Sequence, residues 1–300
     1  MGFRIRTNVA SLVGQRHLQD NTAAMNQSLE RLSSGYRINR SADDAAGLAV
    51  SESLRAKVRG LNMAKRNAND AVSMVQIAEG SMNEISNIMI RMRELTVQSA
   101  SDTVGNTERG YLNREYTNLV DEVDRIANTT EFNNIMLFQA PQEQFVIQVG
   151  TTNGAPAGYE DKIPKDNSNT ISISLNGLKF NSKDLGLSNQ AEIGPTPSDP
   201  GESPSREQIA EKLDTIDAAL NRMASERATL GSIQSRLGSA MNNLSISTEN
   251  MATANSRIRD VDFASETSQL TQMRVLTQSS TAVLTQANAA PEMALQLLRQ

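Results

Sequence analysis

Seven of the eight prolines in this chain fall between residues 141 and 204, and the eighth is Pro291. Proline inside a helix removes a backbone hydrogen bond and clashes with the preceding turn, at a cost of about 3 kcal/mol. The segments on either side of the proline cluster are therefore free to form very long helices, whereas the cluster itself is not. The predicted order of the chain is helix, central insert, helix.

The first flank carries an apolar stripe that advances in alternating steps of three and four residues. This spacing keeps one helix face buried along its length, and alanine in the stripe lets a neighbouring helix approach closely. The pattern predicts a long helix from Ser41 to about Ser101. The stripe consists of Leu61, Ala64, Ala68, Ala71, Val75, Ala78, Met82, Ile85, Met89 and Met92.

The second flank has an apolar residue at every seventh position, which predicts a long helix with gentle left-handed supercoiling. These residues are Ile216, Met223, Leu230, Leu237, Leu244, Met251 and Ile258. A shorter helix is predicted from about Tyr111 to Asn128. Three rods that share apolar seams predict a mainly α fold, a long antiparallel coiled-coil helix bundle made from both chain ends.

The central insert has a different periodicity. Apolar side chains recur at every second position, at Phe145, Ile147 and Val149 and again over residues 171–175, which is the pattern of half-buried strands. The second run is followed by Asn176-Gly177, a dipeptide suited to a two-residue hairpin turn. A small central β-hairpin element is therefore predicted, followed by an irregular proline-rich tether.

Residues 31–53 read as a joint between two helices. Gly35 is placed to end the first helix in the left-handed conformation, and Ser41 with Asp44 three residues later predicts a capping box that starts the next. The last forty residues mirror the first forty, with apolar positions on a polar background. Each terminal helix alone buries too little surface to offset its chain entropy, so we expect both to be poorly ordered until they meet a partner, and other copies of the chain are the expected partner.

Composition excludes several classes of function. A net charge of -5 and no dense run of Lys or Arg disfavour a nucleic-acid binder. The chain has no cysteine and one histidine, His17, so neither a thiolate or histidine metal site nor a Ser-His-Asp triad can be built. We expect no cofactor, no metal and no enzymatic activity. No apolar run long enough for a secretory signal peptide or a membrane span is found in the sequence.

Long ordered stretches of both flanks resemble one family. The segments "LERLSSGYRINRSADDAAGLAVSESLRAKVRGL", "RMRELTVQSA" and "DEVDRIANTTEFNNIMLF" in the first flank, and the tail "LTQANAAPEMALQLLRQ", are similar to bacterial flagellins. The resemblance covers roughly four fifths of the chain, in the order and in the halves where the family has these segments. It extends into "FVIQVGTTNG" and "SKDLGL", which resemble the hairpin region of the family's outer-rod domain.

The resemblance implies a division into two concentric layers of a filament. Residues 1–40 and 261–300 would be the terminal helices of the inner tube, D0. Residues 41–140 and 203–260 would be the helical rod of the outer tube, D1, and residues 141–202 its hairpin region and tether, with no large outer domain. The resemblance implies a spoke between the layers at Gly35, Arg37, Asn39 and Arg40, with a return near residues 257–263, and filament-core packing by Leu18, Met25, Leu29, Leu32, Leu284, Leu297 and Leu298.

The function implied is that of a structural subunit which polymerises into the flagellar filament, the helical propeller for swimming. The implied partners are further copies of the chain, other flagellins, the flagellar type III export apparatus and its chaperone, and the hook-associated and cap proteins. The implied location is outside the cell, in a filament that is sheathed or periplasmic where the organism's flagella are. Two alternatives stay open: a hook-filament junction protein, which shares the terminal pattern, and a coiled-coil signalling module, which would need a membrane span or sensor domain.

One surface has a sharper implication. In many flagellins "RMRELTVQSA" contributes to the surface bound by the flagellin-sensing Toll-like receptor, and matching by motif assigns that contact to Arg91, Leu95 and Glu115. Ile90 stands where strongly recognised flagellins often have Gln. The alternative is that these residues serve subunit packing first.

Overall fold

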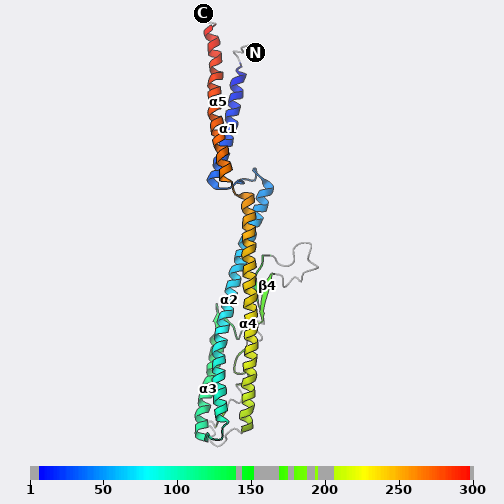
Figure 1. The fold of residues 1–300 in the computed structure, drawn as a ribbon, viewed down its shortest axis with the longest axis vertical. Coiled ribbons are helices and arrows are strands. Elements are labelled where there is room, and N and C mark those ends of the chain that lie inside the picture. Colours follow the sequence, from blue (N-terminus) through cyan, green and yellow to red (C-terminus); the bar gives the residue numbers. More distant parts are fainter. Residues whose placement is uncertain are drawn as a thin grey trace, which may run out of the picture. The chain divides into compact units, whose positions relative to one another are not determined.

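The computed structural model describes residues 7–139, 144–151, 169–174, 179–187, 193–194 and 206–297, without the side chains of Arg206 and residues 290–297. The helices within these ranges are α1 (Val9–Ser34), α2 (Ala45–Ser99), α3 (Asn106–Thr129), α4 (Arg206–Arg259) and α5 (Phe263–Leu297) (Figure 1). The strands are β1 (Glu131–Phe132), β2 (Ile135–Met136), β3 (Gln144–Gln148) and β4 (Thr170–Ser174). The predicted mainly helical fold with a small central β element is confirmed.

The chain forms two compact units, one of residues 1–58 with 249–300 and one of residues 59–248. Both boundaries fall inside long helices, α2 and α4, and away from the joint at residues 35–44. Of the described helices, none is long and apolar enough to cross a membrane.

In the second unit, α2, α3 and α4 share one apolar core. Every member of the predicted α2 stripe is buried, and Ala68, Met82 and Met92 have no exposed surface. The heptad positions of α4 are buried from Ile216 to Leu244, and the last two, Met251 and Ile258, are half-buried. On the surface Arg93 donates from Nε to Asp217 Oδ1 at 2.6 Å, which ties α2 to α4.

The predicted antiparallel β element is formed by β3 and β4, with Val146 opposite Ser172. Ile171 and Ile173 point into the core, because alternate side chains of a strand face the same side. The predicted turn at Asn176-Gly177 lies outside the described residues.

A second small hairpin, β1 with β2, was not predicted. Its turn residues Asn133 and Asn134 have φ of 51° and 62°, a left-handed conformation that asparagine tolerates and two-residue hairpins require. The Asn133-Asn134 dipeptide was therefore a sequence signal for this hairpin turn.

In the first unit, the ends of the helices are set by single residues. Asn8 accepts a hydrogen bond from the Ser11 amide at the start of α1, and Asp262 accepts one from the Ala264 amide at the start of α5. Gly35 ends α1 with φ of 75°, and its N–H donates to the Arg31 carbonyl. The left-handed conformation predicted for Gly35 is confirmed.

The predicted capping box at Ser41 is wrong. α2 begins at Ala45, and Asp44 caps it by accepting from the Gly47 amide at 2.8 Å. The neighbouring carboxylate of Asp43 accepts the Asn39 and Arg40 amides instead, which folds the residues around Ser41 into a turn ahead of the helix. Asp44 therefore caps α2 and Asp43 holds the turn before it, whereas the sequence pattern had assigned the cap to Ser41.

Candidate assembly and recognition surfaces

The α1 and α5 helices pack against each other through small and polar residues. The residues that α1 buries are Ser11, Gly14 and Ser28. Leu284 of α5 occupies the space that Gly14 leaves, since a Cβ added to Gly14 would lie 3.4 Å from Leu284 Cδ1. The seam therefore permits close approach of the two helices but buries little apolar side-chain surface.

Polar contacts run along the length of the same seam. The Asn8 amide donates to the Ala287 carbonyl at 2.8 Å, and the Asn21 amide donates to Ser280 Oγ at 3.1 Å. At the other end Arg31 Nη1 lies 3.8 Å from Glu266 Oε2. These contacts pair low residue numbers with high ones, so the helices are antiparallel.

Large apolar side chains of α1 and α5 lie on the outside of the pair. Leu12 is 53% exposed and Val283 is 59% exposed. Among the side chains that the structure describes in the two helices, the exposed large apolar ones are Val9, Leu12, Val13, Leu29, Phe263, Val275, Leu276 and Val283. The pair thus leaves large apolar side chains exposed, although its seam also holds half-buried leucines and methionines, and such exposed apolar surface is what other molecules would bury.

The residues predicted to pack in a filament core fall into three groups. Leu18, Met25, Leu32 and Leu284 are half-buried within the single chain, whereas Leu29 is exposed. The side chain of Leu297 and the whole of Leu298 lie outside what is described. Leu29 is thus the one predicted residue of this set, among those described, that is largely free to meet another copy.

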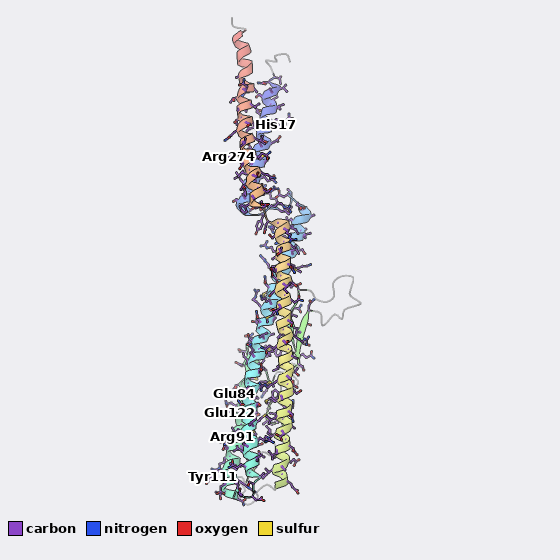
Figure 2. The ribbon with its side chains drawn as sticks, viewed as in Figure 1. His17, Glu84, Arg91, Tyr111, Glu122 and Arg274 are labelled. Atoms are coloured by element: carbon purple, nitrogen blue, oxygen red, sulfur yellow. The ribbon has the colours of Figure 1, made fainter. Side chains whose placement is uncertain are left out.

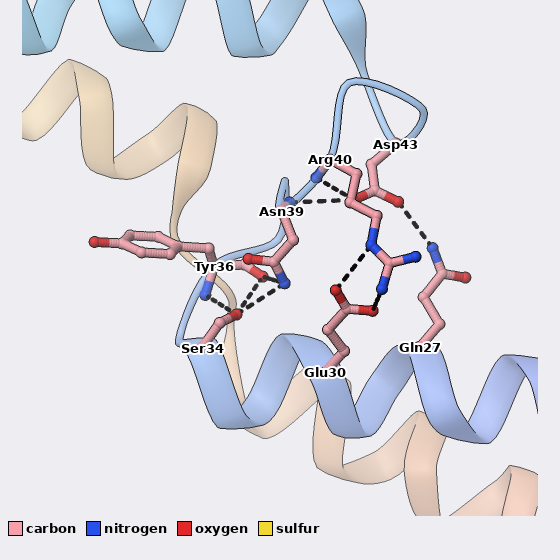
Figure 3. Close-up of polar contacts among 7 residues, drawn as sticks. All are labelled: Gln27, Glu30, Ser34, Tyr36, Asn39, Arg40 and Asp43. Carbon is pink, nitrogen blue, oxygen red and sulfur yellow. Dashed lines mark hydrogen bonds and ion pairs between the residues drawn. The ribbon is translucent and has the colours of Figure 1, made fainter.

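The predicted spoke residues form a hydrogen-bonded loop on the end of α1 (Figure 3). The Asp43 carboxylate accepts from the Asn39 amide at 3.1 Å, the Arg40 amide at 3.0 Å and Gln27 Nε2 at 3.1 Å. The two backbone amides, that of Arg40 first, lower the pKa of Asp43 below its ordinary 3.8, because they stabilise its charged form. Asp43 is therefore the centre of the loop.

Two further contacts hold the loop to α1. Arg40 forms a two-pronged ion pair with Glu30, with Nε and Nη2 at 3.1 and 2.9 Å from the carboxylate oxygens. The Asn39 side chain donates to Ser34 Oγ at 2.8 Å. Both pairs are exposed, so their role is to fix the direction of the loop more than to add stability.

The outgoing and returning segments are joined by backbone hydrogen bonds. The Arg37 amide donates to the Arg259 carbonyl at 2.6 Å, and the Val261 amide donates to the Gly35 carbonyl at 3.0 Å. Tyr36 and Asp260 form an antiparallel bridge between them. Residues 259–261, which belong to the segment predicted as the return, therefore lie directly against residues 35–37.

Sequence reasoning missed Arg259, which joins three segments. Its guanidinium lies 4.7 Å from the centre of the Tyr36 ring, and Nη1 donates to Glu52 Oε1 at 2.6 Å. This hydrogen bond is the largest cause of the lowered pKa of Glu52. No local pattern could have identified Arg259, because its partners are about 207 and 223 residues away.

The motif-matched recognition residues separate into a surface pair and a core residue. Arg91, labelled in Figure 2, donates to Glu115 Oε1 from Nε at 2.9 Å and from Nη2 at 2.8 Å, and to Glu94 from Nη1 at 3.0 Å. The hydrogen bond to Glu115, ahead of that to Glu94, raises the pKa of Arg91. Leu95 has no exposed surface and packs in the core beneath.

The single histidine has no site around it. His17 lies exposed on α1 (Figure 2), and among the described residues no three His, Asp or Glu side chains gather closely enough to hold a metal ion.

Comparison with known proteins identifies relatives over the whole length. Residues 5–143 match the model of the bacterial flagellin N-terminal helical region, and residues 213–298 match that of the C-terminal helical region. Flagellin of Bacillus subtilis (strain 168) is 38% identical over 99% of this chain and 100% of its own length. Flagellin FlaB2 of Treponema pallidum (strain Nichols) is 36% identical over 98% of this chain and 99% of its own length.

Solved structures share the fold. The structure of a putative flagellar hook-associated protein from Vibrio parahaemolyticus covers 73% of this chain and 100% of its own, with a TM-score of 0.55 and 13% sequence identity. At that identity the likeness concerns the fold alone.

Proposed function

The chain belongs to the bacterial flagellin family and is a subunit of the flagellar filament, and on this premise we propose that the α1·α5 pair is its filament-core element. In this proposal residues 1–40 and 261–300 form the inner layer, and residues 41–140 and 203–260 form the outer rod. Residues 141–202 form the hairpin region and tether. The spoke at Gly35, Arg37, Asn39 and Arg40 joins the two layers.

The observation that supports the proposal is the set of large apolar side chains that α1 and α5 leave exposed. Burial of apolar surface contributes roughly 25 cal/mol per Å², so side chains such as Leu12 and Val283 stabilise an assembly only if another copy covers them. The contact between the two helices of one chain leaves these side chains uncovered. In a helical polymer such a surface is buried, because every subunit makes the same contact with its neighbours.

The test is salt-induced polymerisation of the purified chain, observed by negative-stain electron microscopy. The intact chain is compared with a variant that lacks residues 1–40 and with the double variant Leu12→Asp/Val283→Asp. Gln15→Asp is the matched control, because it adds a charge to an exposed polar position of α1.

We expect long hollow filaments from the intact chain and from Gln15→Asp, and none from the other two, whose rods should keep their helical circular dichroism. Filaments from the variant without residues 1–40 would contradict the assignment of α1 to the core. Short rings from the intact chain would favour the hook-filament junction alternative.

Family membership also suggests partners for this chain. These are other flagellins, the flagellar export apparatus with its chaperone, and the hook-associated and cap proteins. The exposed apolar face of α1 and α5 supports this part of the proposal, because a chaperone that covers it would prevent premature assembly. Loss of chaperone binding in Val283→Asp, measured by calorimetry, is the expected result.

A recognition role for the Arg91–Glu115 surface is proposed on the motif resemblance. Both side chains are about half exposed, and their ion pair holds the guanidinium in place on the surface. Leu95, which is buried, would act through packing. Arg91→Ala should lower activation of the flagellin-sensing Toll-like receptor by the soluble chain. Arg125→Ala, which removes the exposed Arg125–Glu122 ion pair within α3, should not.

A further inference from the structure

The seam between α1 and α5 continues the three-and-four spacing of a coiled coil. Each helix places a buried or half-buried residue at every seam position. The α1 positions are Ser11, Gly14, Leu18, Asn21, Met25, Ser28 and Leu32, and the α5 positions are Glu266, Leu270, Met273, Thr277, Ser280, Leu284 and Ala287. A seam with this repeat can slide by one heptad and still place seam residues opposite seam residues, so the apolar positions alone do not select one alignment.

Two side-chain pairs distinguish the observed register from the shifted ones. Asn21 donates to Ser280 Oγ, and a slide of seven residues would place Asn21 opposite Met273 or Ala287. Ala287 has no acceptor in its side chain and the thioether of Met273 is only a weak one, so the half-buried amide would lose its hydrogen bond to a hydroxyl.

The second pair is ionic. Arg31 faces Glu266, which is 6% exposed and is the one acidic residue of α5 before Glu292. A slide in either direction removes Glu266 from Arg31 and leaves a buried carboxylate without a cation. Asn8 adds less discrimination, because it donates to a backbone carbonyl and every residue offers one.

We propose that the Asn21–Ser280 and Arg31–Glu266 pairs are positioning elements that fix the register of the terminal helices. A polar residue at a coiled-coil seam lowers stability but selects one alignment. The role rests on the proposed function: every subunit must present the same outer face, because the outward apolar side chains of α1 and α5 are aligned only in one register.

The chain has no cysteine, so engineered disulfides report the register directly. Ser11→Cys/Ala287→Cys reports the observed register, and Ser28→Cys/Thr277→Cys reports an alignment shifted by one heptad. One heptad of helix is about 10 Å, and a disulfide needs Cα atoms within about 7 Å, so each pair reads a single register. These replacements are small, and both cysteine pairs lie outside the two tested contacts.

Each cysteine pair is placed in three backgrounds: the natural chain, the register variant Asn21→Leu/Ser280→Leu/Arg31→Leu/Glu266→Leu, and the control Asn26→Leu/Gln278→Leu at exposed positions. The soluble chains and any filaments are oxidised, and intramolecular bonds are separated from intermolecular ones by non-reducing electrophoresis. Mass spectrometry identifies the linked peptides.

We expect the observed-register bond alone in the natural and control backgrounds, and both bonds in the register variant, which should also melt at a higher temperature. If the polar pairs served only to stabilise the helix pair, their replacement by leucine would lower the melting temperature instead. The proposal is overturned if the shifted bond is absent from the register variant, or if it forms in the natural chain. Failure of the natural chain to form filaments would instead count against the proposed function, since the disulfides are also read in the soluble chain.

Discussion

Glycine has opposite effects on stability at two positions, Gly35 at the end of α1 and Gly80 inside α2. Gly35 has φ of 75° and nothing within 4 Å of an added Cβ, so its only constraint is the backbone conformation. Gly80 lies within α2, also with open space, in a conformation that any residue adopts. The first is required by the end of a helix, and the second weakens one.

Substitution of both glycines by alanine should therefore change stability in opposite directions. Gly35→Ala should destabilise the end of α1 by about 1–2 kcal/mol, the cost of a side chain in the left-handed region. Gly80→Ala should stabilise α2 by about 0.5–1 kcal/mol. Hydrogen exchange read peptide by peptide measures local opening at both sites. Equal effects of the two substitutions would contradict the assignment of Gly35 as a conformational cap.

The Asp43 carboxylate makes the spoke loop sensitive to acid. Because backbone amides lower its folded-state pKa below the ordinary 3.8, its contribution to stability is present above about pH 3.8 and is lost as the pH falls through the lowered value. Protection of the Arg40 amide from exchange should therefore persist below pH 3.8 and then fall. In Asp43→Asn the protection should be weaker throughout and lack this pH step.

Glu30→Gln is the control for this titration. It removes the ion pair with Arg40 but leaves the bonds to Asp43, so the pH step of the Arg40 amide should remain. A step that disappears in Glu30→Gln would contradict the assignment of the acid response to Asp43.

At the scale of elements, α2 depends on alanine where it packs most closely. Ala71 and Ala78 are each 3% exposed and lie on either side of Val75 in the same buried stripe. Ala78→Leu adds volume to a filled core and should cost about 1–3 kcal/mol in urea unfolding, and Ala71→Leu should behave alike. Ala228→Leu on the exposed side of α4 should cost little.

The same substitutions test whether close packing lets filaments change shape. Closely packed seams of Ala and Met can shift between packings in small steps, and a leucine should block the shift. Filaments of Ala71→Leu and Ala78→Leu are expected to keep one straight form under the light microscope, whereas Ala228→Leu filaments keep the normal waveform. Normal waveforms from both core variants would refute the link between this seam and filament shape.

The long helices were predictable because their signal is local and repeated. All ten residues of the α2 stripe lie on the same buried face, so a misread residue at one position would not change the prediction of the helix. The start of α2 was harder, since Ser41, Asp43 and Asp44 are all good capping residues and only the loop geometry selects among them.

Contacts between distant segments could not be predicted from periodicity. The bridge between Tyr36 and Asp260 and the stack of Arg259 on Tyr36 join the two ends of the chain, where no spacing rule applies. The resemblance to a family predicted a spoke at residues 35–40, but it did not predict that Asp43 and Arg259 would hold this loop. The polar character of the α1·α5 seam likewise depends on which helix faces are paired.

For the whole molecule, the exposed apolar side chains of α1 and α5 determine how assembly responds to temperature. Apolar burial weakens on cooling because its driving force near room temperature is entropic. Assembly that buries Leu12 and its neighbours should therefore have a critical concentration that falls on warming from about 5 °C to about 25 °C.

The sharpest form of this prediction uses Leu12, which is 53% exposed in the single chain. Leu12→Ala should raise the critical concentration for growth on filament seeds roughly tenfold, since about 1.4 kcal/mol of burial is lost per added subunit. It should also make the critical concentration less dependent on temperature. Gln19→Ala, at an exposed polar position of the same helix, should change neither quantity. Sedimentation of filaments at several temperatures measures both, and identical values for Leu12→Ala and the natural chain would place Leu12 outside the contacts that hold subunits together.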